Sequence, residues 1–459
     1  MSPTTAVAGP HLVRYGTAAD QRFLLGEFLD GYHELVINAN MVAHMPTALA
    51  SFICQRAGSK PYFIDPQTHA FQHDPRQLES ASPGKEGTIK TSISKLLEAY
   101  GQPVKNVVGN KHSAVSPQDF ANVQIRQAFC KRVIDFQYGV LANKITKSDA
   151  AKYYRFLEKK GKMSAKRCHP TLVVAPYFYM TRTSKAWWLP VNVAMLADCR
   201  RLKPLAPLAA QVVIEKGILL DDACLTNIVA EYSKAKPDVF LVWVDSFPEE
   251  EASSDELRAL VHLIQSLGKT APVVNLYGGF FSITLRSCGV VNELIGIVHG
   301  LEYGEARGVV PVGGGIPTAK YYYPELHSRL LFRDAMRAVR EVGGLRSPKE
   351  FFAKVCACEE CRSVIKNNPE HDFSQYGITK QVSFTRKGQP VVVDYPIPET
   401  KAHSVKHYMW CKAKEYSTPA SKADTLTALK AAARLERALG KAVAGHCGIW
   451  HEVLTKPGT

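Results

Sequence analysis

The sequence contains no apolar run that approaches the roughly 20 residues a membrane helix needs. Its first residues, MSPTTAVAGPHLVRYG, lack the basic and apolar regions of a secretory signal. No G-x-G-x-x-G follows an expected strand, and the glycines at 313–315 do not lead into Gly-Lys-Ser/Thr. We therefore expect a cytoplasmic protein with no membrane partner and no nucleotide-binding loop of these two kinds.

Disulfide bonds are not expected either. The chain has eleven cysteines, an odd number, and most are scattered among apolar residues, as free thiols of a cytoplasmic protein are. Acidic residues are too few to balance the basic ones, because 57 Lys and Arg against 42 Asp and Glu give a formal net charge of +15. Such an excess attracts polyanions, above all nucleic acid, although solvated surface lysines would give the same count.

What is present is an alternation of short apolar runs and helical patterns. The runs are apolar throughout, which indicates strands buried on both faces of a parallel sheet. Strands are predicted at 34–40, 61–65, 171–176, 210–214, 238–244, 272–277 and 294–299, with helices at 117–139, 221–235 and 254–268. This α/β pattern favours a (β/α)8 TIM-like barrel with insertions, although an open doubly wound sheet uses the same ingredients.

The character of the sequence changes after Gly344. Residues 1–344 are predicted to form the barrel, with a polar insertion around 75–115. Residues 345–459 are predicted to form a zinc-binding and C-terminal helical subdomain, in which 370–400 resembles strands and turns and 403–445 is helical.

A cysteine cluster, VCACEECRS, places thiols at Cys356, Cys358 and Cys361. This spacing lets three sulfurs meet on one tetrahedral Zn²⁺. A fourth ligand is needed, and His403 and His407 lie one helical turn apart, so that only one of them need bind. We expect a structural zinc ion that ties the barrel to the C-terminal helix.

The C-x-C-x-x-C cluster with a later histidine resembles the zinc signature of tRNA-guanine transglycosylases. In that family an aromatic-rich helix start follows the histidine, which matches His407-Tyr408-Met409-Trp410 and favours His407 over His403. Two motifs depart from the tRNA enzymes, at the Asp65-Pro66-Gln67-Thr68-His69 turn and at His299-Gly300-Leu301-Glu302-Tyr303-Gly304-Glu305. With these departures the chain looks most like the DNA-guanine transglycosylases of 7-deazaguanine DNA-modification systems.

Base exchange at C1′ needs a carboxylate nucleophile and a group that moves a proton between the two bases. Active sites of such barrels lie at the carboxyl ends of the strands. Three acids follow predicted strands: Asp65, Asp245 and Glu305. Asp65 also occupies the place of the family's first aspartate, and Glu305 lies where the family's nucleophile is expected. The choice of nucleophile between Asp245 and Glu305 stays open.

Candidates for binding the substrate base are Gln67, His69 and Glu215, and the resemblance adds Gly300 and Tyr303. Three consecutive tyrosines, Tyr321–Tyr323, are candidates for stacking on bases. The resulting hypothesis is a transglycosylase that exchanges guanine in DNA for a 7-deazaguanine base, the 7-cyano form by resemblance, with accessory proteins of a modification system as further partners. The alternatives are the same chemistry on tRNA, and a non-catalytic zinc-containing nucleic-acid-binding protein.

Overall fold

The computed structural model describes residues 10–16, 18–53, 60–80, 87–147, 160, 169–301, 305–310, 318–386, 389–418, 420–440, 443 and 445–456. Within these residues, every helix is too short or too polar to cross a lipid bilayer.

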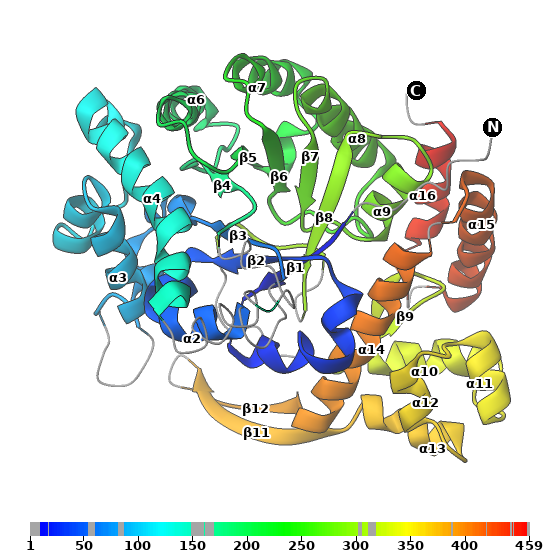
Figure 1. The fold of residues 1–459 in the computed structure, drawn as a ribbon. Coiled ribbons are helices and arrows are strands. Elements are labelled where there is room, and N and C mark those ends of the chain that lie inside the picture. The colour runs from blue at the N-terminus through cyan, green and yellow to red at the C-terminus, as the bar shows by residue number, and fades with distance from the viewer. Residues whose placement is uncertain are drawn as a thin grey trace.

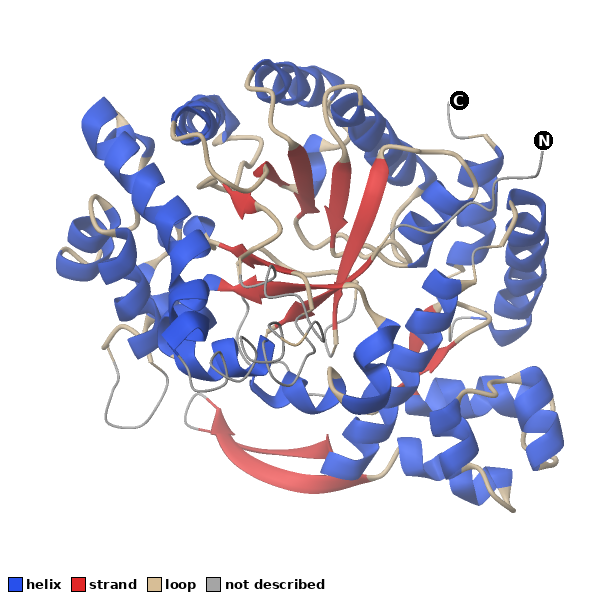
Figure 2. Cartoon of the chain, viewed as in Figure 1, coloured by secondary structure: helices blue, strands red, loops and turns tan. Residues whose placement is uncertain are grey.

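Eight parallel strands form a nearly closed barrel of the TIM type (Figures 1 and 2). Their order around the sheet is β3-β2-β1-β8-β7-β6-β5-β4. The strands are β1 His11–Tyr15, β2 Glu34–Asn38, β3 Tyr62–Asp65, β4 Val173–Val174, β5 Leu208–Ile214, β6 Val239–Val244, β7 Val273–Leu276 and β8 Leu294–Gly300. The barrel prediction is confirmed, and the open doubly wound alternative is wrong. The first strand was not predicted.

Alternate residues of each strand point into the barrel, where they form a core separate from the one beneath the helices. The inward set includes Leu12, Val36, Phe63, Val174, Ala209, Val213, Leu241, Trp243, Val274, Leu276 and Val298. Neighbouring residues point outward and pack against the helices. Both faces of every strand are therefore buried, which explains why the strands read as continuous apolar runs in the sequence.

Helices cover the outside of the barrel (Figure 1). They are α1 Ala39–His44, α2 Pro46–Ser51, α3 Thr91–Tyr100, α4 Val123–Lys147, α6 Lys185–Arg201, α7 Asp222–Lys234, α8 Ser254–Gly268 and α9 Phe280–Ser287. The helices predicted at 221–235 and 254–268 agree with α7 and α8 to within one residue at each end. The one predicted from 117 begins later, because Pro117–Phe120 forms a separate 3-10 turn.

After the barrel, the chain forms two antiparallel hairpins and a group of helices. The strands are β9 Lys320–Tyr323 with β10 Ser328–Leu331, and β11 Thr379–Arg386 with β12 Gln389–Pro396. The helices are α10 Phe332–Glu341, α11 Pro348–Lys354, α12 Glu359–Val364, α13 Pro369–Phe373, α14 Pro398–Ser417, α15 Lys422–Leu439 and α16 His446–Thr455. Helix α14 packs on β9 and α12, so it connects the cysteine cluster to the barrel side of the molecule.

One glutamine completes the seam of the barrel between β3 and β4. Thr171 donates its N–H to the Tyr62 carbonyl at 2.8 Å, which joins the two strands at one point. The N–H and C=O of Val174 are instead bonded by the side-chain amide of Gln137 from α4, each at 2.8 Å. Gln137 is fully buried and takes the place of a strand partner.

We therefore expect Gln137→Leu to lower the free energy of unfolding by about 2–4 kcal/mol, because it leaves two buried backbone groups of Val174 unpaired. Urea unfolding measures this. The matched control is Gln118→Leu, at an exposed glutamine just before α4, which should unfold like the wild type. Equal stability of the two variants would contradict this account of the seam.

Candidate functional site

Two side chains from β1 and β3 form a buried ion pair at the carboxyl end of the barrel. Arg14 Nη2 lies 2.9 Å from Asp65 Oδ2, and the side chains are only 4% and 1% exposed. Asp65 Oδ1 also accepts hydrogen bonds from the Gln67 N–H at 3.0 Å and the Tyr177 hydroxyl at 2.6 Å. Burial alone would raise the pKa of Asp65, but Arg14 and these donors together hold it below its usual value.

His69 extends this group through Tyr177. Its Nδ1 lies 2.9 Å from the Tyr177 hydroxyl. Because that hydroxyl donates its one proton to Asp65, it accepts from His69, so Nδ1 carries the proton of the neutral ring. Burial lowers the pKa of His69 to about 3, which keeps the ring neutral at physiological pH.

Asp245 is the first residue after β6, where the sequence predicted a reactive carboxylate. It is partly exposed, unlike Asp65. Oδ2 accepts from the Tyr179 hydroxyl at 2.9 Å, and Oδ1 accepts from the Ser246 hydroxyl at 3.1 Å and the Val309 N–H at 2.7 Å. All three donors are neutral, so they orient the carboxylate without cancelling its charge.

Aromatic rings and a second arginine link the surroundings of the two aspartates. The Trp243 ring centroid is 5.3 Å from that of His69 and 5.0 Å from that of Tyr277. The guanidinium carbons of Arg14 and Arg307 lie 5.3 and 5.9 Å from the Tyr277 centroid. We call Arg14, Asp65, His69, Tyr177, Tyr179, Trp243, Asp245, Tyr277 and Arg307 the mouth cluster. Within the part of the chain that the structure describes, Nε and Nη1 of Arg14 are buried with no hydrogen-bond partner.

The other residues predicted to bind the base have different surroundings. Gln67 adopts a left-handed conformation with φ 53°, and its side chain accepts from the Asn40 N–H at 3.1 Å. Glu215 accepts from the Arg182 N–H at 2.8 Å. Gly300 ends β8 and is paired in register with Arg14. Tyr303 lies outside the described residues, so its predicted role stays a prediction, as do those of the other three.

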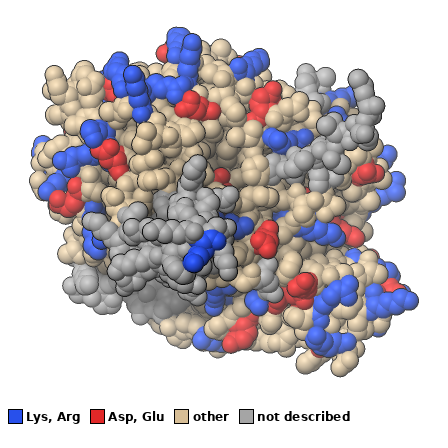
Figure 3. All heavy atoms as spheres, viewed as in Figure 1, with Lys and Arg blue, Asp and Glu red and all other residues tan. Residues whose placement is uncertain are grey.

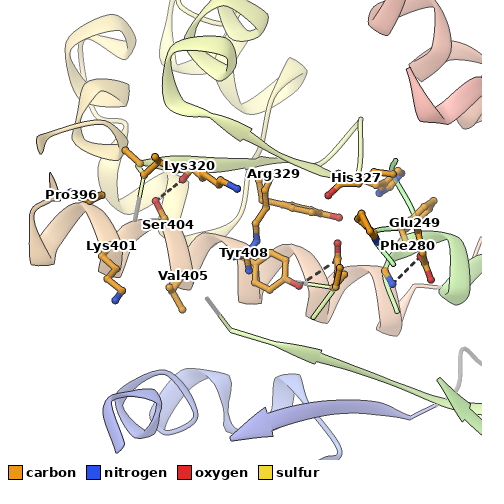
Figure 4. A pocket seen from close by; sticks show the side chains of 18 of the residues that line it. Glu249, Phe280, Lys320, His327, Arg329, Pro396, Lys401, Ser404, Val405 and Tyr408 are labelled. Carbon is orange, nitrogen blue, oxygen red and sulfur yellow. Dashed lines mark hydrogen bonds between the residues drawn. The ribbon is translucent and has the colours of Figure 1, made fainter. Parts of the chain in front are cut away.

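Glu305 lines a cavity of about 430 Å³ whose lining contains no residue of the mouth cluster. Figure 4 shows this cavity with Glu249, Phe280 and Tyr408 among its walls. The cavity is enclosed by the loops after β6, β7 and β8 and by α14 and β9. Glu305 pairs with the buried Lys412 and accepts from the Tyr408 hydroxyl at 3.3 Å. Glu249, on the same wall, accepts from the Gly279 N–H at 2.9 Å; burial, with a further contribution from Glu305, raises its pKa to about 7. Glu305 is therefore held in an ion pair with Lys412.

The cysteine cluster and His407 meet as predicted and could hold a metal ion. The ligand atoms of Cys356, Cys358, Cys361 and His407 all lie within 4.8 Å of one another. His407 Nδ1 is 3.3 Å from Cys358 Sγ and 3.4 Å from Cys361 Sγ. Nε2 of the same ring donates to the Tyr322 carbonyl at 2.7 Å, which leaves the Nδ1 lone pair directed at the sulfurs.

The alternative ligand His403 is wrong. Its Nδ1 lies 2.5 Å from Oε1 of Glu360, the residue before Cys361, so the ring faces this carboxylate and is not among the residues grouped with the cysteines. The stacking role predicted for Tyr321–Tyr323 is also wrong, because all three are at most 1% exposed. The Tyr321 ring instead stacks on His407, with centroids 4.2 Å apart, and packs the cysteine cluster against β9.

The chain matches no protein-family model and no curated protein. The resemblance to transglycosylases therefore depends on the sequence motifs alone. Sequence reasoning missed six residues of the mouth cluster: Arg14, Tyr177, Tyr179, Trp243, Tyr277 and Arg307. For Arg14 a signal existed, since it is the one charged residue in the apolar run HLVRY.

We expect Arg14→Met to lower the free energy of unfolding by about 3–5 kcal/mol at pH 7, because it leaves the Asp65 carboxylate buried without its cation. In the wild type the Asp65 pKa is lowered, so its stabilising contribution is lost as pH falls through that value. The difference between variant and wild type should therefore shrink below about pH 4. Urea unfolding at several pH values measures this.

Arg76→Met is the matched control, because Arg76 also pairs with an aspartate, Asp74, but on the surface. Its effect should be small at every pH. A constant difference for Arg14→Met between pH 7 and pH 3 would contradict the linkage to Asp65.

For the cysteine cluster, we expect His407→Ala to lose one bound metal ion per chain, and His403→Ala, one turn away on α14, to keep it. Elemental analysis of the purified proteins measures both. Loss of metal from His403→Ala, with retention by His407→Ala, would reverse the assignment of the fourth ligand.

Proposed function

We propose that this protein is a DNA-guanine transglycosylase that exchanges guanine for a 7-deazaguanine base, with 7-cyano-7-deazaguanine as the incoming base. The observation that carries the proposal is the mouth cluster, in which Asp65 and Asp245 flank aromatic and arginine side chains at the carboxyl end of a TIM-like barrel. Base exchange needs one carboxylate that attacks and a fixed electrostatic environment that holds the base.

Asp245 suits the role of nucleophile. Its carboxylate is partly exposed and is oriented by neutral donors only. One oxygen would attack C1′ while the bond from C1′ to guanine N9 breaks, and the departing guanine takes up a proton from water. In the second half, the incoming base gives up its proton to water, attacks C1′ and releases the Asp245 carboxylate, so that no net proton is consumed.

Asp65 suits a positioning role. Its lowered pKa and its ion pair with Arg14 keep it ionised, so it does not act as an acid at neutral pH. It holds Arg14 and Tyr177 in place, and the unpartnered N–H groups of Arg14 are donors for an oxygen or ring nitrogen of the base. Trp243 and Tyr277 offer aromatic surfaces against which a flipped base can pack.

We propose zinc as the ion of the cysteine cluster, in a structural role. Three thiolates and one imidazole complete a tetrahedral shell, which leaves no position for a catalytic water. The ion would hold Cys361 of α12 against His407 of α14 and so fix the helix that faces the cavity.

A DNA partner agrees with the net charge of +15. Figure 3 shows Lys and Arg spread over the visible face among acidic residues. The net charge therefore supports a general attraction to DNA, and this face shows no continuous basic track. The preference for DNA over tRNA comes from the resemblance alone and needs a direct test.

We expect the wild type to incorporate labelled 7-cyano-7-deazaguanine into guanine-containing DNA and not into bulk tRNA. Incorporation into tRNA alone would replace DNA by tRNA as the substrate. Incorporation into neither, with DNA still bound in a filter assay, would indicate a non-catalytic binding protein. Accessory proteins of the same system should be added before that conclusion is drawn.

Two carboxylate variants identify the nucleophile. We expect Asp245→Asn to abolish the covalent complex with DNA and to lower turnover at least about 1,000-fold, whereas Glu305→Gln should still form the complex. Denaturing gels of the trapped complex separate the two. A complex formed by Asp245→Asn and missing in Glu305→Gln would assign the attack to Glu305.

A further inference from the structure

Three possible metal ligands come together where α15 ends and α16 begins, away from the cysteine cluster. They are Glu436 of α15 and His446 and Cys447 of α16, and they are only 3%, 1% and 0% exposed. Their ligand atoms, a carboxylate oxygen, an imidazole nitrogen and a sulfur, all lie within 4.8 Å of one another. Figure 1 shows the two helices side by side, and they pack closely.

The histidine ring is held with one nitrogen toward this group. Nε2 of His446 donates to the Leu326 carbonyl, in the turn between β9 and β10, at 2.7 Å. In a neutral ring Nδ1 then has a free lone pair. Nδ1 lies 3.2 Å from Glu436 Oε1, yet it is buried with no hydrogen-bond partner in the part of the chain described.

A buried nitrogen and a carboxylate oxygen at this distance need something positive between them, because two acceptors repel. A proton on Nδ1 would serve only if it pointed at the oxygen, and the two atoms do not have hydrogen-bond geometry. A metal ion needs no such alignment. Two ligands about 2.0–2.2 Å from a tetrahedral Zn²⁺ lie about 3.3–3.5 Å apart, close to the observed 3.2 Å.

The sulfur of Cys447 supplies a third donor. As a thiol it has weak contacts with the Leu326 carbonyl, at 3.9 Å, and with the Glu436 carboxylate. Glu436 already accepts from the Cys447 N–H with both oxygens at 3.1 Å, and so caps the start of α16. Helix capping accounts for the buried Glu436 carboxylate. It does not account for the unpartnered Nδ1 of His446 or for the Cys447 thiol beside it. The carboxylate keeps further lone pairs for an ion.

We propose that Glu436, His446 and Cys447 form a second metal site, which takes a divalent ion of the Zn²⁺ class. Oxygen, nitrogen and sulfur ligands together are those that Zn²⁺ accepts. With three protein ligands, the fourth position is left for a water molecule. The site shares no residue with the cysteine cluster, and the inference does not depend on the proposed function.

Such an ion would stabilise the contact between α16 and the loop after β6. Trp450, one turn along α16, donates its indole N–H to the Glu249 carbonyl at 3.0 Å. Glu249 lies in the loop after β6 and lines the cavity beside the mouth cluster. Fixing the start of α16 therefore steadies a loop that begins at Asp245.

The test is the metal content of the full chain after loading with Zn²⁺ and removal of excess ion. We expect about two ions per wild-type chain, one in Cys447→Ser and one in Cys361→Ser. The matched control is Cys199→Ser, at another fully buried thiol, which should keep both. A wild-type chain that saturates with one ion, lost in Cys361→Ser and kept in Cys447→Ser, would overturn the proposal and leave a His446–Glu436 ion pair.

A titration of the metal-free wild type with Co²⁺ gives a readout that needs no variant. We expect two saturating equivalents, the thiolate-rich cluster giving the stronger sulfur-to-metal absorption and the second site a weaker band from one thiolate. Saturation at one equivalent would count against the second site even if Cys447→Ser fails to fold.

Discussion

The ion pair between Arg14 and Asp65 is the interaction on which the mouth of the barrel depends. Both partners are almost fully buried, so each would be costly without the other. They come from β1 and β3, which lie on either side of β2, so the pair forms only when these three strands are in register. The two charges therefore come together only in the folded barrel.

The orientation of the neighbouring groups follows from this pair. Because Asp65 stays ionised, the Tyr177 hydroxyl donates to it and His69 must donate to Tyr177. A chain of three side chains thus has its protons placed by one charge. Electrostatic catalysis requires polar groups that are fixed before a substrate binds. The mouth cluster has this property.

Helix α14 connects the cysteine cluster to the cavity beside the mouth cluster. His407 faces the cysteines, while Tyr408 and Lys412 on the same helix contact Glu305 in the loop after β8. Lys412 is 1% exposed and also pairs with Glu415 at 2.8 Å. Lys412 can reach both Glu305 and Glu415 only if α14 is correctly placed. The contact of His407 with the cysteine cluster helps to place this helix. A metal ion held by this cluster would thus affect the loop after β8 through α14, without a direct contact to it.

The sequence predicted those parts of the molecule whose signals are local. Seven strands are continuous apolar runs, and three thiols within six residues need no tertiary information to suggest a metal. The strand β1 was missed because Arg14 interrupts its apolar pattern, and the reason for that arginine is Asp65, fifty-one residues later. Tyr177 and Tyr179 follow a strand of only two residues, where nothing local distinguishes a tyrosine of the mouth cluster from one that only packs in the core. Lys412 reads as a solvated helix residue, because its partner Glu305 is remote in sequence.

The difference between the two aspartates also arises from this remote pairing. Asp65 and Asp245 both follow a buried strand, and their sequence contexts alone would suit either role. Arg14 is on β1, two strands from β3 but three strands from β6 around the barrel through β8, and its charge compensates Asp65 while Asp245 has neutral donors. A carboxylate whose charge is already matched by a buried cation gains little by attacking an electron-poor carbon. In the proposed reaction, a carboxylate that is merely oriented keeps its negative charge for C1′. The pairing of Arg14 with Asp65, which neighbours in sequence do not reveal, is thus the reason why we propose Asp245 as the reactive group.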